Sequence, residues 1–490
     1  MRSFMERLRR PRTLIALAVA ALVLAGAAAY GYFEIYKPPE DVSNPDVAFD
    51  ASDDEETEAP KKAKPDDFVW PTYGLTNRRT RYLDAKVKPP YRRIWTLRGD
   101  GLLEYTPVLA KGTLYHVRNS GMAEAFDAAT GRFRWRRDLG ALNASSPTYA
   151  KNRLFVSLLD PQRIVALSAK TGRVLWKREL PSRSESSPVV IDGIVYFGSE
   201  DGTVYALRAK NGARRWTFQT ADAVYGVSYA NGRLFFGDKS GKVTAVNARS
   251  GKLIWQQQTN GAAFGGGGIF YSTPAVAFGR VYIGNADSKV YSFSARDGSL
   301  AWTYSTGHYV YGGPAVADIP GLGPTVYIGS YDQTFYALDA RNGELRWSHD
   351  SPGEISGAAT IVGDIVYFSS FDGGTTGLGV KTGKVRFRWP DGRYTPVISD
   401  GRRIYLTGYA QVYGLVPRGS EEARQAVRRE RQAAREKRRA ARAKRQGPRA
   451  KRQGARAKRR ASRATRAKKA RTAKERKRRA RRSKRKKKRS

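Results

Sequence analysis

The amino-acid sequence predicts an all-β fold: an eight-bladed β-propeller of four-stranded blades, with an N-terminal transmembrane helix and a disordered basic C-terminal tail. Three observations predict it. A phrase ending in Trp recurs at steps of 39 to 47 residues. Short β-branched and aromatic runs bounded by turn residues fill each interval, as in strands. The composition, with 49 Gly and 11% aromatic residues, is typical of strands and tight turns.

The recurring phrase joins an Ala, a Gly and a Trp at constant spacing. It is complete at Ala125–Trp135 (AFDAATGRFRW), and a degraded copy, GLGVKTGKVRF, starts at Gly377. The Thr-Gly, Asn-Gly, Ser-Gly and Asp-Gly pairs favour the positive-φ turn before the last strand of a unit. We interpret the phrase as a structural docking motif, carried by Ala125, Gly131, Trp135, Ala166, Gly172, Trp176, Ala206, Gly212, Trp216, Ala245, Gly251, Trp255, Gly298, Trp302, Ala337, Gly343, Trp347 and Gly383.

Each repeat reads as four short strands, and a small pair such as Thr106-Pro107 opens it; eight such units are present. One four-stranded sheet cannot bury both of its faces, whereas units of this length stacked around an axis can. The last unit stops after its third strand, near Val412–Val416. Trp95 stands 40 residues before Trp135 without the turn phrase, so we predict that the strand Arg92–Leu97 completes the last blade and closes the ring.

The two ends of the chain differ from the repeats. We predict a cytoplasmic basic segment at 1–12, a transmembrane anchor at 13–33, which has no charge, and an extracytoplasmic remainder. The alternative is a cleaved signal peptide with its site at Ala27–Ala29. Residues 34–67 read as an acidic, Pro-containing disordered linker, 68–417 as the propeller, and 418–490 as a Lys/Arg-rich low-complexity tail.

The phrase A-x-D-x-x-T-G-x-x-x-W resembles the tryptophan-docking motif of PQQ-repeat (quinoprotein alcohol dehydrogenase-like) β-propellers. The resemblance covers about 68–417 and includes Trp70–Gly74, which is similar to the W-P-x-x-G entry of that family. The family contains quinone-dependent alcohol dehydrogenases and the non-enzymatic propeller of the outer-membrane β-barrel assembly machinery. The resemblance implies either function, since one fold hosts both.

In the family's enzymes, pyrroloquinoline quinone (PQQ) lies near the ring axis on a tryptophan floor, is bridged to calcium, and often lies under a disulfide of adjacent cysteines. Here cysteine is absent, and eight of the nine tryptophans fall in or beside docking slots; Trp389 lies two residues past the slot that Phe387 fills. PQQ and calcium are therefore disfavoured. We assign no catalytic, cofactor-binding or metal residue, and we expect a chain that is not an enzyme.

Three further groups are candidates for binding. Gly265–Gly268 reads as a flexible loop between blades rather than a phosphate cradle. Asp201, Asp287 and Asp332 follow turns, where they either hold the turn or ring one mouth of the propeller. A set of aromatic residues near blade turns is suited to lining a binding face for peptide or sugar: Tyr225, Tyr309, Tyr311, Tyr331, Phe371 and Tyr409.

The tail from 421 to 490 carries 36 basic and 5 acidic residues, a net charge of +31 out of +45 for the chain. Outside the cytoplasm we expect it to attach to anionic polymers or lipids; nucleic acid is the alternative partner. The sequence thus predicts a single-pass, membrane-anchored, non-catalytic scaffold with a monomeric propeller, which binds an envelope protein or anionic polymer. The alternatives are a PQQ- and calcium-dependent dehydrogenase and a nucleic-acid-binding protein.

Overall fold

The computed structural model describes residues 40–52, 68–99, 101–259, 268–394 and 396–486. The chain divides into two compact units, Met1–Arg418 and Gly419–Ser490. The predicted basic segment and anchor at 1–33 lie outside the described residues. Among the residues that are described, none belongs to a helix of the length and apolarity needed to cross a membrane.

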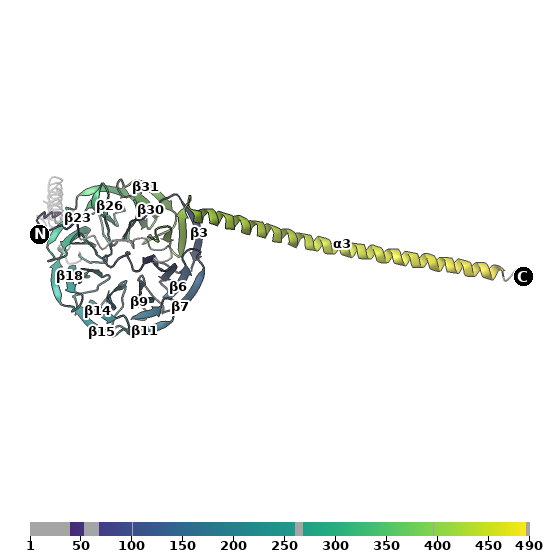
Figure 1. The fold of residues 1–490 in the computed structure, drawn as a ribbon, viewed down its shortest axis with the longest axis horizontal. Helices are drawn as coiled ribbons and strands as arrows, with labels where there is room; N and C mark the ends of the chain where they lie inside the picture. The colour runs from purple at the N-terminus through teal and green to yellow at the C-terminus, as the bar shows by residue number, and fades with distance from the viewer. Residues whose placement is uncertain (1–39, 53–67, 100, 260–267, 395, 487–490) are drawn as a thin grey trace, which may run out of the picture. The chain divides into compact units, whose positions relative to one another are not determined.

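The first unit is an eight-bladed β-propeller, which confirms the predicted fold (Figure 1). In each blade the strands run from the axis outward. Blades 1 to 4 contain β4 (Val108–Ala110), β5 (Thr113–Val117), β6 (Met122–Asp127) and β7 (Phe133–Asp138); β8 (Thr148–Ala150), β9 (Arg153–Leu158), β10 (Arg163–Ser168) and β11 (Val174–Glu179); β12 (Val189–Ile191), β13 (Ile194–Gly198), β14 (Thr203–Arg208) and β15 (Arg214–Gln219); and β16 (Ser228–Ala230), β17 (Arg233–Gly237), β18 (Lys242–Asn247) and β19 (Leu253–Gln258).

Blades 5 to 8 repeat this order around the ring. They contain β20 (Ala275–Ala277), β21 (Arg280–Gly284), β22 (Lys289–Ser294) and β23 (Leu300–Ser305); β24 (Ala315–Ile319), β25 (Gly323–Gly329), β26 (Thr334–Asp339) and β27 (Leu345–Asp350); β28 (Thr360–Val362), β29 (Ile365–Ser370), β30 (Gly374–Gly379) and β31 (Val385–Trp389); and β32 (Val397–Ser399), β33 (Ile404–Thr407), β34 (Gln411–Pro417) and β3 (Tyr91–Arg98).

The apolar core lies between neighbouring blades. A middle strand such as β13, Ile-Val-Tyr-Phe-Gly, is buried along its whole length, because a neighbouring blade covers each of its faces. An outer strand such as β15, Arg-Arg-Trp-Thr-Phe-Gln, instead alternates exposed and half-buried positions. The continuous apolar runs of each repeat are therefore the buried middle strands, and the runs in which polar residues alternate with aromatic ones are the partly exposed outer strands.

Neighbouring blades are joined by the tryptophans of the repeated phrase. The Trp216 indole N–H donates to the Ala248 carbonyl at 3.0 Å, and its ring lies against Gly251. Gly251 has φ +72°, and a Cβ there would lie 2.7 Å from the ring, so glycine is needed on both counts. The same N–H···O bond, 2.9 to 3.2 Å long, is made by Trp95, Trp135, Trp176, Trp255, Trp302 and Trp347.

The ring closes through a strand from the start of the repeat region. β3 pairs antiparallel with β34, with Arg92 opposite Val416, and so supplies the outer strand of blade 8. Trp95 on β3 donates to the Ala128 carbonyl of blade 1 at 3.2 Å. The two ends of the repeat region thus share one sheet, and the ring has no open seam at this point.

Residues 68–83 run around the inside of the ring. β1 (Val69–Trp70) pairs with β4, and β2 (Tyr82–Leu83) pairs parallel with β28. Between these strands, the carbonyls of Pro71, Asn77, Arg78, Thr80 and Arg81 accept hydrogen bonds from the innermost strands of blades 2, 4, 5, 6 and 7. The segment therefore gives the inner wall of the ring partners for N–H groups that would otherwise face the channel.

Residues 40–52, part of the linker expected at 34–67, lie on the propeller, so the expectation of a disordered spacer is wrong for these residues; the rest of the linker lies outside the described residues. Ser43 forms an antiparallel bridge with Trp302 at the outer strand of blade 5. Asp41 forms an ion pair with Lys289 (2.9 Å), and the Phe49 and Phe278 rings stack at 5.2 Å. We call residues 40–52 the strap. It adds backbone pairing to an edge that would otherwise be free.

The second unit contains one helix, α3 (Glu421–Lys486), where a disordered tail was expected. The helix is rich in Ala, Arg, Lys and Glu, all of which have high helix propensity, and Glu421 and Glu422 lie in its first turn, where the helix dipole favours acids. The described side chains at 428–441 and 451–484 are all exposed. Low hydrophobicity excludes a core in this segment, but it does not exclude a single helix.

Candidate binding site at the axial mouth

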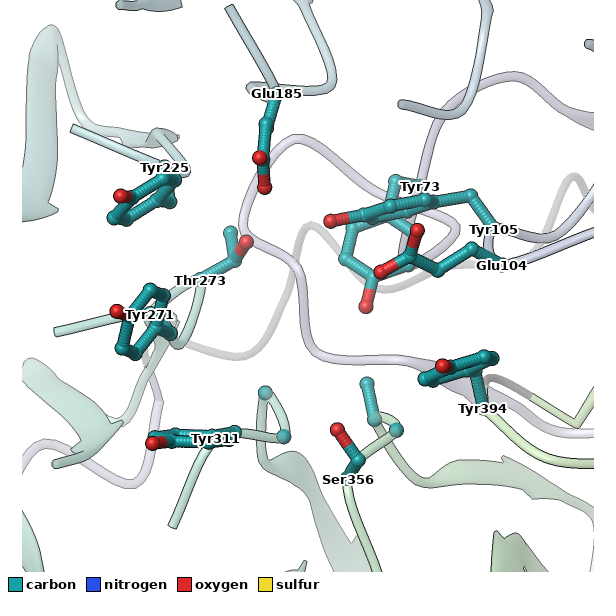
Figure 2. A pocket seen from close by; sticks show the side chains of 14 residues that line it. Tyr73, Glu104, Tyr105, Glu185, Tyr225, Tyr271, Thr273, Tyr311, Ser356 and Tyr394 are labelled. Carbon is teal, nitrogen blue, oxygen red and sulfur yellow. The ribbon is translucent and has the colours of Figure 1, made fainter. Parts of the chain in front are cut away.

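A hollow of about 170 Å³ lies at one mouth of the propeller (Figure 2). Its walls come from the loops that lead into the innermost strands. In each blade, one residue of this loop occupies the same position relative to the innermost strand. It lies four residues before the strand begins, or three residues before it in blade 4. In blades 1 to 8 it is Glu104, Ala144, Glu185, Tyr225, Tyr271, Tyr311, Ser356 and Arg393. Six of these eight residues line the hollow, all except Ala144 and Arg393.

Two carboxylates, Glu104 and Glu185, form the polar part of the hollow, and Figure 2 shows both pointing into it. Burial, followed by the negative charges of Glu104 and Glu200, raises the pKa of Glu185 to about 7. Burial also raises the pKa of Glu104, although the Asn119 amide donates to it at 3.2 Å. Burial therefore disfavours the charged form of both carboxylates.

Tyrosines form most of the remaining wall. Successive rings lie close together, with centroid distances of 4.9 Å for Tyr225–Tyr271, 4.8 Å for Tyr271–Tyr311 and 4.7 Å for Tyr311–Tyr331. The series continues through Phe371 (5.9 Å from Tyr331) to Tyr394 (5.7 Å from Phe371). We call these six residues the aromatic arc. It runs through the loops of blades 4 to 8.

The structure brings together most of the aromatic residues that the sequence singled out. Tyr225, Tyr311, Tyr331 and Phe371 lie in the arc. Tyr309 stacks on Tyr311 at 5.5 Å. Tyr409 joins the group through Arg393, whose guanidinium lies 5.7 Å from the Tyr409 ring and 5.2 Å from Phe371. Tyr309 and Tyr409 are 42% and 49% exposed, so large apolar rings are presented to solvent at this mouth.

Sequence reasoning missed the residues that complete the hollow: Tyr73, Glu104, Tyr105, Glu185, Tyr271 and Tyr394. A signal for three of them, Glu104, Glu185 and Tyr271, was present in the repeat frame, because they occupy the equivalent position before the innermost strand, where the residue type varies more than in the docking phrase. Tyr73 had no such signal, because it belongs to the segment that runs inside the ring.

Below Tyr73 the channel contains two buried arginines. Arg79 is completely buried, and its guanidinium donates to the carbonyls of Val227 (3.3 Å) and Ser187 (2.8 Å) and to the Thr72 hydroxyl (2.7 Å). Burial, followed by the charge of Arg81, lowers the pKa of Arg79 to about 9. The Arg81 guanidinium lies 4.7 Å from the Tyr73 ring. These side chains fill the channel beneath the hollow.

The three aspartates noted from the sequence hold turns. Thr203 N–H donates to Asp201 at 3.0 Å, Lys289 N–H to Asp287 at 3.0 Å, and Thr334 N–H to Asp332 at 2.8 Å. None of the three lines the hollow. Of the glycine run at 265–268, only Gly268 lies within the described residues, so its predicted role stays a prediction.

The docking residues lie between blades and away from the hollow, which no tryptophan lines. Trp70 is 1% exposed and pairs with Leu109 across β1 and β4, in the wall of the ring. Within the described residues, no three His, Asp or Glu side chains converge as metal ligands would.

Comparison with known proteins is consistent with this architecture. The family model of PQQ repeats described as outer membrane protein assembly factor BamB matches residues 86–223, 119–269 and 220–426. No curated protein is similar to the chain at a significant level. The structure of BamB from Moraxella catarrhalis is 16% identical, with 68% of this chain and 99% of that chain covered and a TM-score of 0.57.

Enzymes share the fold as well. Quinohemoprotein alcohol dehydrogenase ADHIIG from Pseudomonas putida HK5 is 16% identical, with 76% of this chain and 83% of that chain covered and a TM-score of 0.61. A europium-containing methanol dehydrogenase is 14% identical, with 74% and 100% covered and a TM-score of 0.61. At these identities the likeness shows the fold alone.

Proposed function

Because the chain belongs to the family of PQQ-repeat propellers described as outer membrane protein assembly factor BamB, we propose that it is a non-catalytic, protein-binding scaffold of the cell envelope. The observation that carries this proposal is the aromatic arc together with the exposed rings of Tyr309 and Tyr409. Tyrosines supply large, rigid contact area with a polar tip, and they are enriched in the centres of protein interfaces. The mouth with the arc is the proposed binding face.

The residues at the axis do not fit PQQ as the family's enzymes hold it. That site needs a tryptophan floor, and the hollow has none. It also needs several oxygen ligands for a bridging calcium, whereas only two carboxylates line this hollow, and the described residues contain no larger acidic group. Its volume of about 170 Å³ is below the roughly 300–1,000 Å³ of sites that enclose such ligands. A binding role agrees better with these residues.

The compositions of the two ends of the chain favour a location at a membrane surface. Residues 13–33 carry no charge and follow five arginines, a pattern that favours an anchor with the propeller outside the cytoplasm. The +31 charge of residues 421–490 then attracts anionic lipids or envelope polymers without sequence specificity. In this proposal the anchor and the tail hold the propeller near the envelope, and the mouth binds its protein partner.

Site-specific photocrosslinking in the native cell tests the binding face. A photoreactive phenylalanine replaces Tyr409 or Tyr331 at the mouth, and in a matched control it replaces Phe133, which is 56% exposed on outer strand β7. We expect one defined protein adduct from the mouth positions and none from Phe133. Equal adducts from all three positions, or none from the mouth, would contradict the proposed face.

Thiol labelling tests the topology, because the chain has no cysteine of its own. Lys170→Cys lies at an exposed turn of blade 2, and Ser3→Cys lies in the predicted cytoplasmic segment. In spheroplasts we expect an impermeant maleimide to label Lys170→Cys at once and Ser3→Cys only after lysis. Protection of Lys170→Cys until lysis would place the tail in the cytoplasm, and nucleic acid would then become its expected partner.

A further inference from the structure

The hollow has two chemically different sides. Blades 1 and 3 contribute Glu104 and Glu185, and blades 4, 5 and 6 contribute Tyr225, Tyr271 and Tyr311 at the equivalent position. Figure 2 shows Tyr225, Tyr271 and Tyr311 together on one side of the hollow and Glu104 on another, beside Tyr73 and Tyr105. Seven of the eight blades keep the docking Trp, whereas the residue type at this position near the axis changes from blade to blade.

The two carboxylates lack a cationic partner in the hollow. The lining residues include no Lys, Arg or His. The nearby Arg393 lies over the Phe371 and Tyr409 rings, and no described ion pair involves Glu104 or Glu185. The pKa of Glu185 is raised by burial and by repulsion from Glu104 and Glu200, although the charge of Arg183, which does not line the hollow, opposes this. A positive group placed between Glu104 and Glu185 would relieve the repulsion between these two carboxylates.

The tyrosines suit the same kind of ligand. The face of an aromatic ring attracts a cation, and the attraction grows as water is excluded. A volume of about 170 Å³ admits one side chain rather than a polycyclic molecule. The open side of the hollow faces the mouth where the exposed rings of Tyr309 and Tyr409 would contact the backbone around such a side chain.

We propose that the hollow binds the cationic side chain of a lysine or arginine on an extended segment of the partner protein. The ammonium or guanidinium group lies between Glu104 and Glu185, and the aliphatic stem lies against the tyrosines. This inference rests on the proposed function, since it names what the partner presents to the mouth. It also explains why negative charge is retained in a site where burial disfavours it.

The test uses the full chain in detergent micelles and ligand-observed NMR titration. The probes are the blocked peptide Gly-Ser-Lys-Ser-Gly and the same peptide with the lysine Nζ acetylated, which keeps the stem and removes the charge. We expect the lysine peptide to bind about tenfold more tightly than the acetylated one. Glu104→Gln/Glu185→Gln should remove this preference, whereas the matched control Glu344→Gln, an exposed residue of blade 6 that does not line the hollow, should keep it.

Equal affinity for the two peptides, no detectable binding of the lysine peptide, or an unchanged preference in the double variant would overturn the inference. A thermal melt of the double variant shows whether it has kept its fold, and Tyr271→Ala provides a second variant that leaves both carboxylates in place and should weaken the lysine peptide. Failure of the inference can be distinguished from failure of the proposed function. Crosslinks at Tyr331 and Tyr409 that persist in the double variant would support the scaffold and reject the cation site.

Discussion

The perimeter and the mouth of this propeller use the same repeat in opposite ways. On the perimeter, seven tryptophans dock on the next blade with nearly identical geometry. At the mouth, the equivalent position is Glu, Ala, Tyr, Ser or Arg depending on the blade. The retained residues hold blade to blade, and the varied ones make a surface with distinct sides. Repetition therefore indicates structure here, and departure from repetition indicates the candidate site.

The largest effect that separates the two regions is expected on the perimeter, at Gly212. It has φ +73°, and a Cβ there would lie 2.8 Å from the Trp176 ring. We expect Gly212→Ala to lower the free energy of unfolding by about 3 kcal/mol, from the disfavoured φ and the displaced ring together. Gly193, with φ +77° and nothing within 4 Å of a Cβ, is the control; Gly193→Ala should cost only about 1 kcal/mol in the same denaturant melt.

A smaller loss is expected at the axis, beneath the mouth. Arg79→Met removes a guanidinium that holds carbonyls of two blades, and it should lower the free energy of unfolding by about 2 kcal/mol. Arg81→Met is the comparison, because the Arg81 guanidinium donates to the carbonyls of Arg79 and Pro314 and to none of the carbonyls of blades 3 and 4 that Arg79 holds, within the described hydrogen bonds. Chemical denaturation of both variants checks the order. An equal loss of unfolding free energy in Arg79→Met and Arg81→Met would show that the two arginines stabilise the fold through packing alone.

The charge at the mouth should make stability depend on pH. The pKa of Glu185 is raised from 4.5 to about 7 by burial and then by Glu104 and Glu200, with Arg183 opposing. The folded state therefore holds this proton more tightly than the unfolded chain does. Stability from this group is complete below pH 4.5 and is lost as pH rises through 7, by on the order of 1–2 kcal/mol after allowance for solvent. Glu185→Gln should flatten that decline between pH 5 and 8 in thermal melts.

The smallest of these effects concerns one hydrogen bond on the perimeter. Trp216→Phe keeps a ring in the docking slot but removes the N–H that donates to the Ala248 carbonyl. We expect a loss of about 1 kcal/mol in the free energy of unfolding beyond that from the smaller ring. Trp70 provides the control, since within the described residues its buried N–H has no hydrogen-bond partner, so Trp70→Phe should lack this contribution.

The perimeter could be predicted from sequence because its contacts recur. Trp95 matched the docking slot by spacing alone, and β3 does complete blade 8. The mouth could be predicted only in part. Tyr311 and Phe371 lie near recognisable turns, but the role of Glu185 emerges only when equivalent positions are compared and the loops meet at the axis.

Segments outside the repeat were beyond prediction for a physical reason. Asp41 contacts Lys289 and Ser305 across more than two hundred residues, and no periodic pattern links them. An acidic segment poor in apolar residues reads as disordered unless the surface that receives it is known. Arg79 is likewise placed by the Ser187 carbonyl of blade 3, and the Tyr73 ring packs on the Tyr105 ring of blade 1.

The strap has a consequence for how a partner is found. If residues 13–33 span the membrane as proposed, six residues, 34–39, separate the membrane from the strap, a reach of at most about 21 Å, in place of the 34 residues of 34–67. Local concentration falls as roughly the −3/2 power of tether length, so the shorter tether raises the mouth's effective concentration at the membrane roughly tenfold. A partner embedded in the same membrane would then meet the mouth in a nearly intramolecular encounter.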